Sequence, residues 1–74
     1  IAYDLTESGP IRLAVYNARG ELVRTLVDGL GTAGSHAASW DGRDEAGRRC
    51  ASGVYYARLK AGGIHSTRKM SLVQ

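Results

Sequence analysis

Apolar and polar residues alternate along most of this chain, with the two-residue period of β-strands. In the first fifteen residues every large apolar side chain stands at an odd position, with small or polar residues between. Successive side chains of a strand point to opposite faces, so this period indicates strands with one buried face. Similar segments recur between turn-forming residues, and the pattern predicts strands at residues 1–6, 11–16, 21–28, 35–40, 54–60 and 64–73.

The segment 21–28 fits two patterns. Its Leu and Val residues lie on one face of a helix, and the same residues suit a strand that is buried on both faces. The segment is short for a helix, a glycine stands on each side of it, and a hairpin turn precedes it. These features favour a strand.

Turn-forming residues separate the strands at regular intervals. Turns or loops are expected at residues 7–10, 17–20, 29–34, 41–52 and 61–63. Asn17 followed by Gly20 is typical of a type I turn closed by a glycine bulge. Six short strands, or seven if residues 48–51 add one, predict an all-β antiparallel sandwich or barrel. A two-sheet sandwich is expected, because a single sheet would leave its apolar residues in water.

We interpret the stretch 40–56 as a structural clasp, in which a polar loop lies between two aromatic anchors. The stretch contains the only Trp, the only Cys and two of the four Tyr. Trp40 and Tyr55 are expected to be the core anchors, each burying roughly 150–250 Å². Trp40, Tyr55 and Tyr56 could instead form an aromatic platform for sugar or peptide, but only one of the two adjacent tyrosines can point inward. Tyr56 and Arg58 then lie on the opposite face, and they are the candidate partner surface.

Asp41, Asp44 and Glu45 place three carboxylates within five residues. Carboxylates in a flexible loop suit Ca²⁺, which takes six to eight oxygen ligands, so these residues are calcium candidates. Their spacing differs from that of an EF-hand loop. The alternative is two nested turns, in which Asp41 accepts backbone N–H groups and residues 44–47 repeat the Asx-x-x-Gly pattern of residues 17–20. We favour the turns.

No arrangement of residues in the sequence indicates catalysis or a zinc site. His36 and His65 are 29 residues apart, with no Cys or carboxylate at ligand spacing around them. Ser35 points to the strand face opposite to His36, and Ser52 and Cys50 have no neighbouring base to activate them. A non-enzymatic protein without a cofactor is therefore expected.

Composition narrows the picture further. Seventy-four residues make one domain, and the net charge of +3 is spread along the chain instead of forming the basic stripe of a nucleic-acid-binding protein. A single Cys excludes an intrachain disulfide, and Cys50 is expected to be a small core residue. No segment approaches the roughly 20 apolar residues of a membrane span, and none of these 74 residues has the pattern of a signal peptide. The chain begins in a strand without Met, which suggests an excised domain.

Four motifs in this order resemble the FlgD-type immunoglobulin-like domain, which is named after the flagellar hook-capping protein. They lie at residues 16–26, 40–47, 51–55 and 69–70. The pattern is also similar to the C-terminal sorting domain of the type IX secretion system. The resemblance covers nearly the whole chain and implies a non-catalytic immunoglobulin-like sandwich of six or seven strands. By this resemblance the fold, and with it the clasp, depends on Trp40, Asp41, Gly42, Asp44, Gly47, Gly53 and Tyr55.

The resemblance leaves three functions open. We expect residues 1–74 to be one FlgD-type domain at the C-terminus of a larger secreted or surface protein of a bacterium, serving export, anchoring or assembly. Its partners would be proteins, namely parent-chain domains, secretion or assembly machinery or further copies, with no nucleic acid and no membrane insertion. A structural subunit or cap of an extracellular appendage, pairing through edge strands 1–6 or 64–73, is the first alternative. A carbohydrate- or calcium-binding module using Tyr56 or the loop 41–45 is the second.

Overall fold

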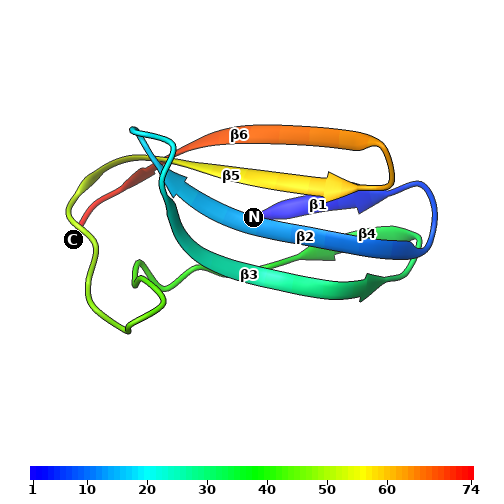
Figure 1. Ribbon diagram of the computed structural model, residues 1–74, viewed down its shortest axis with the longest axis horizontal. Helices are drawn as coiled ribbons and strands as arrows, with labels where there is room; N and C mark the ends of the chain where they lie inside the picture. Colours follow the sequence, from blue (N-terminus) through cyan, green and yellow to red (C-terminus); the bar gives the residue numbers. More distant parts are fainter.

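The computed structural model describes residues 1–74 and contains six β-strands and no helix (Figure 1). The strands are β1 (Ala2–Leu5), β2 (Gly9–Asn17), β3 (Leu22–Gly31), β4 (Gly34–Ala37), β5 (Gly53–Ala61) and β6 (Ile64–Leu72). All six predicted strands are therefore present, and the ambiguous segment 21–28 is a strand. With no helix in the structure, there is none that could cross a membrane.

The strands form two antiparallel sheets, as an immunoglobulin-like sandwich requires. The larger sheet has the order β3-β2-β5-β6, and β1 pairs with β4 in a two-stranded sheet. Figure 1 shows the four long strands as one layer, with β1 and β4 behind it. The all-β sandwich predicted from the alternation is confirmed.

The core lies between the two sheets, on the inner face of the larger one. Register pairs Leu13 with Leu59 and Val15 with Ala57, so these residues share one face. Leu13 and Val15 are fully buried. The smaller sheet adds Leu5, which is 5% exposed. Burial of large aliphatic side chains, each contributing about 1.5–3 kcal/mol, holds the two layers together.

Strand β3 contains two bulges that explain its mixed pattern of apolar residues. Its register with β2 shifts between Leu13 and Ala14 and again between Val15 and Tyr16. Each shift sets two residues of β3 against one of β2, and this changes which face the following side chains occupy. The segment therefore lacks a clean two-residue period, although it is a strand throughout.

Some boundaries and glycine positions differ from those predicted. The expected loop 29–34 is shorter, because β3 continues to Gly31 and pairs with the start of β2 at Gly9. At Gly31 the two sheets approach so closely that there is no room for a larger side chain. A Cβ at Gly31 would lie 2.7 Å from Leu5 Cδ1 and 3.0 Å from Ile11 Cδ1. Gly31, which was expected in the loop 29–34, therefore belongs to a strand.

The other differences concern the segment after β4. This strand ends at Ala37, so the prediction that it reaches Trp40 is wrong. Residues 48–51 form no seventh strand, and only an isolated bridge joins Arg43 to Arg49. Backbone groups in this region bond within the loop and to neighbouring strand edges instead of forming a ladder of their own.

Candidate functional site

Two surfaces contain the residues singled out in the sequence. One is the clasp loop, residues 38–52, which lies at one end of the sandwich near the C-terminus (Figure 1). The other is the outer face of the larger sheet, which points away from β1 and β4. The clasp loop organises its own backbone, whereas the outer face presents side chains to solvent.

Two turns of the same design frame one end of the sheet. Asn17 Oδ1 accepts hydrogen bonds from the backbone N–H groups two and four residues later, both at 3.0 Å. Asp44 Oδ1 accepts from the corresponding two N–H groups at 2.9 and 3.0 Å. Gly20 and Gly47 close the turns with the same φ of 82°, in the left-handed region that favours glycine. The predicted repeat of the Asx-x-x-Gly turn is confirmed.

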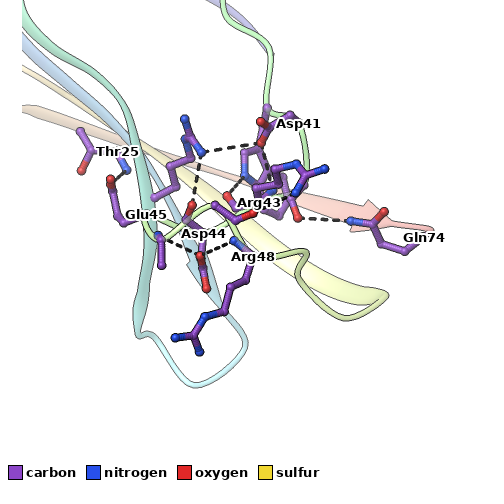
Figure 2. A network of polar contacts seen from close by, with 12 residues as sticks. Thr25, Asp41, Arg43, Asp44, Glu45, Arg48 and Gln74 are labelled. Atoms are coloured by element: carbon purple, nitrogen blue, oxygen red, sulfur yellow. Dashed lines mark hydrogen bonds and ion pairs between the residues drawn. The ribbon is translucent and has the colours of Figure 1, made fainter.

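Glu45 fastens the clasp loop to the free edge of β3. Its backbone N–H donates to Val23 O at 3.1 Å. Its Oε1 accepts the Thr25 N–H at 2.6 Å (Figure 2). Val23 is the extra residue at one of the β3 bulges, where the strand edge is irregular. Glu45 therefore caps part of an edge that would otherwise be open to pairing.

Arg24 joins the same loop from the strand side. Its Nη1 donates to Asp44 O at 3.2 Å and lies 3.9 Å from Asp41 Oδ1. Asp41 Oδ1 also accepts the Arg43 N–H at 3.0 Å, as expected for a turn carboxylate. Both partners of the ion pair are partly exposed, so the backbone hydrogen bond contributes more to rigidity than the charge pairing does.

Gly42 is the contact between the clasp loop and the C-terminal residues. It is buried, with φ at 77°, and its carbonyl accepts from Cys50 N at 2.8 Å and from Gln74 Nε2 at 3.2 Å. A Cβ here would lie 2.6 Å from Gln74 Nε2 and 3.2 Å from Leu72 Cδ1. Both the backbone conformation and the available space therefore require glycine.

The aromatic anchors pack against each other, but only one of them belongs to the core. The Trp40 and Tyr55 rings meet edge to face, with centroids 5.1 Å apart. Tyr55 is buried and donates its hydroxyl to Ala51 O at 2.7 Å. Trp40 is half-buried and donates its indole N–H to Arg43 O at 2.9 Å. The expectation that Trp40 is a core anchor is corrected: it lies beyond β4 and braces the loop.

Cys50 is half-buried beside Tyr55. Burial, and after it the negative charge of Asp44, raise the pKa of the Cys50 thiol. Burial, followed by the charge of Cys50, also raises the pKa of the Tyr55 hydroxyl. The thiol therefore stays protonated at neutral pH, and a protonated thiol is a poor nucleophile.

The structure does not gather the calcium candidates around a common centre. Asp41, Asp44 and Glu45 each bind a different set of backbone N–H groups. Figure 2 shows the Glu45 carboxylate turned toward Thr25, away from the Asp41 side chain. No cluster of three His, Cys, Asp or Glu side chains in the chain is placed to hold a metal ion. The geometry is that of turn chemistry.

The two histidines lie on different sheets. His36 of β4 stacks on Tyr3, with ring centroids 5.4 Å apart, and its Nε2 lies 2.6 Å from Thr32 O. His65 of β6 pairs with Lys60 in the larger sheet. The Ser35 hydroxyl donates to Asp4 Oδ1 at 2.7 Å.

Tyr56 and Arg58 lie on the outer face, opposite in direction to buried Tyr55 and Ala57. Register places Tyr56 beside Tyr16 of β2 and Lys69 of β6. The Arg58 guanidinium carbon lies 4.9 Å from the centroid of the Tyr16 ring. Sequence reasoning found Tyr56 and Arg58 but missed Tyr16 and Lys69. They could have been found only by aligning the predicted strands with one another, because the cross-strand register places them beside Tyr56.

Comparison with known proteins agrees with this architecture. A sandwich of two antiparallel sheets with Asx turns and an edge-capping loop places the chain among immunoglobulin-like modules. Residues 1–63 match the family of FlgD Ig-like domains, and the chain belongs to that family. A crystal structure of FlgD from P. aeruginosa is similar, with a TM-score of 0.66 and 27% sequence identity. The similarity covers 96% of this chain and 56% of that chain. No curated protein matches the sequence.

Proposed function

We propose that this chain is a non-catalytic assembly module of a secreted or surface protein of a bacterium. It would bind another protein, and through this contact its parent protein would be exported, anchored or assembled. Membership of the FlgD Ig-like family carries the proposal, since that family takes its name from a protein of flagellar hook assembly. The similar FlgD chain is longer, which fits a module that works beside further domains.

The unequal edges of the larger sheet support this role. The edge of β3 is broken by two bulges and capped by Glu45. The opposite edge, β6, pairs with β5 over nine residues without a register shift, and its other side is free. A regular free edge is a template for strand addition. We therefore place the protein contact on the β6 side of the sandwich.

In-cell photocrosslinking tests the proposal on the full-length protein in the bacterium that produces it. A photoreactive phenylalanine analogue replaces Thr67, which is exposed on β6, or Ala46, which is exposed at the tip of the clasp loop. We expect covalent protein adducts from position 67 and none from position 46. The absence of adducts at both positions would refute a protein-binding role.

A subunit of an extracellular appendage is the second candidate, and the free β6 edge favours it specifically. In that case the added strand comes from another copy of the chain. Light scattering over a dilution series separates the two candidates. A monomer at every concentration supports a module that binds a different protein, and growth of oligomers with concentration supports self-assembly. The substitution Thr67→Pro should abolish such growth, because proline has no N–H and is poorly tolerated in a sheet.

A further inference from the structure

The outer face of the larger sheet concentrates positive charge beside aromatic rings. Cross-strand register sets Arg12 opposite Lys60, Tyr16 opposite Tyr56, and Tyr56 opposite Lys69. Opposed residues of neighbouring strands share a face, and positions two apart on one strand share it too. We call this surface the outer basic face. Its charged and aromatic residues are Arg12, Tyr16, Asp28, Tyr56, Arg58, Lys60 and Lys69.

This face accounts for the entire net charge of the protein. It holds four of the ten basic residues and, among the carboxylates, only Asp28, which register sets opposite Arg12. The remaining surface holds six basic and six acidic residues, whose charges cancel. The basic residues look dispersed along the sequence, yet the pairing of β2, β5 and β6 brings these four together. An imbalance of this kind favours an acidic partner.

The Arg58 guanidinium is positioned by the Tyr16 ring and can still bind a carboxylate. Its guanidinium packs over the Tyr16 ring at 4.9 Å, a cation–π geometry that fixes the side chain while leaving N–H groups free. The ion pair of the structure joins Arg24 to Asp41, so none of the four cations on this face has a carboxylate within ion-pair distance. A planar guanidinium can bind a carboxylate through two parallel hydrogen bonds.

We propose that the outer basic face binds an acidic segment of a partner protein, with Arg58 as its central carboxylate contact. The proposal rests on the assembly role and names its partner chemistry. Arg58 covers one face of the Tyr16 ring, which leaves less aromatic surface for the stacking by which nucleic-acid bases and sugars bind aromatic side chains. Carboxylates need no such ring face, and an acidic polypeptide supplies them in series.

The test measures binding of the purified chain to a poly-L-glutamate peptide. Calorimetry gives the affinity, and the shifts of backbone amide NMR signals show where the peptide binds. Arg58→Gln should weaken binding about tenfold, the size expected for loss of a charge-assisted hydrogen bond. Arg68→Gln is the matched control, because Arg68 is also exposed, is close in sequence to Lys69, and lies on the inner face beside Ala57. It removes the same charge and should change affinity less than about twofold, since exposed charges act over a screened range. Arg58→Lys should fall between wild type and Arg58→Gln, because lysine keeps the charge but not the fork.

Three results would overturn the proposal: no binding of poly-L-glutamate, equal losses for Arg58→Gln and Arg68→Gln, or shifts outside the outer basic face. Tighter Arg58-dependent binding of a thymidine oligonucleotide would also overturn it in favour of nucleic acid. The outcome is separable from that of the assembly role. Adducts at position 67 without poly-L-glutamate binding would refute only the acidic partner, and Arg58-dependent binding without adducts would refute only the assembly role.

Discussion

Gly42→Ala is the substitution that tests the clasp most directly. The residue has φ at 77°, and an L-residue in the left-handed region costs about 1–2 kcal/mol. The new Cβ would lie 2.6 Å from Gln74 Nε2, so that amide must leave the Gly42 carbonyl. Loss of this hydrogen bond adds about 1 kcal/mol. The expected total of about 2–3 kcal/mol is a large part of the stability of so small a domain.

Gly47→Ala supplies the matched control. Gly47 has nearly the same backbone conformation, with φ at 82°, but a Cβ there would meet nothing within 4 Å. Only the backbone cost of about 1–2 kcal/mol should remain. Urea unfolding followed by the fluorescence of the single Trp gives both free energies on one assay. The loss in free energy of unfolding should be about 1 kcal/mol larger for Gly42→Ala than for Gly47→Ala, and this difference is the contribution of the Gln74 contact.

A double-mutant cycle with Gln74→Ala isolates that contact. Alone, Gln74→Ala removes the hydrogen bond to Gly42 O and should cost about 1 kcal/mol. In the Gly42→Ala background it should cost almost nothing, because the bond is already lost, so the two changes are not additive. Equal costs for the two glycine variants, or an undiminished cost of Gln74→Ala in the double variant, would show that the C-terminus does not close on the loop.

Three further outcomes follow from the same contacts. Asp44→Asn should be nearly neutral, because Asn17 makes the same turn with an amide oxygen, whereas Asp44→Ala should cost about 1–2 kcal/mol by urea unfolding. Gly31→Ala should cost about 1–3 kcal/mol by overpacking against the smaller sheet, while Gly29→Ala, whose Cβ meets nothing within 4 Å, should cost nothing in thermal melts. The pKa values of Cys50 and Tyr55 are raised, so the folded state keeps protons that the unfolded chain releases. Stability is therefore full below about pH 9, the ordinary thiol pKa, and falls at higher pH; Cys50→Ala should lessen the drop in Tm between pH 7.5 and 10.5.

Much of the fold was predictable because its signals are local. The two-residue period of a strand and the Asx-x-x-Gly turn both depend on residues that are close in sequence, and both were found from the sequence. The extent of β3 was missed because glycine signals a turn, while in the structure Gly31 gives Leu5 room to approach. The end of β4 was missed because the alternation continues to Trp40 after the strand pairing has stopped.

The clasp was predictable in its residues but not in its attachments. Asp44 with Gly47 is a local pattern, and it gives the turn that it predicts. The bond from Glu45 to β3 and that from Gln74 to Gly42 join residues at least 20 positions apart, and no local pattern marks either partner. Such contacts become visible only once the strands are paired, because register decides which side chains meet.

The two open surfaces of the sandwich meet at Lys69. This residue belongs to the free edge strand β6 and also points to the outer basic face, in line with Tyr56. An extended segment that added to β6 would place every second side chain on that face, beside Lys69 and its neighbours. A segment with acidic residues at alternate positions would therefore hydrogen-bond to the free backbone groups of β6 and also neutralise the positive charge of the outer basic face. The edge of β3 offers a poorer match, because bulges break its period and Glu45 binds the backbone groups of Val23 and Thr25. The larger sheet is thus irregular and partly capped at the β3 edge but regular and free at the β6 edge, and its excess charge lies on β2, β5 and β6, toward the free edge.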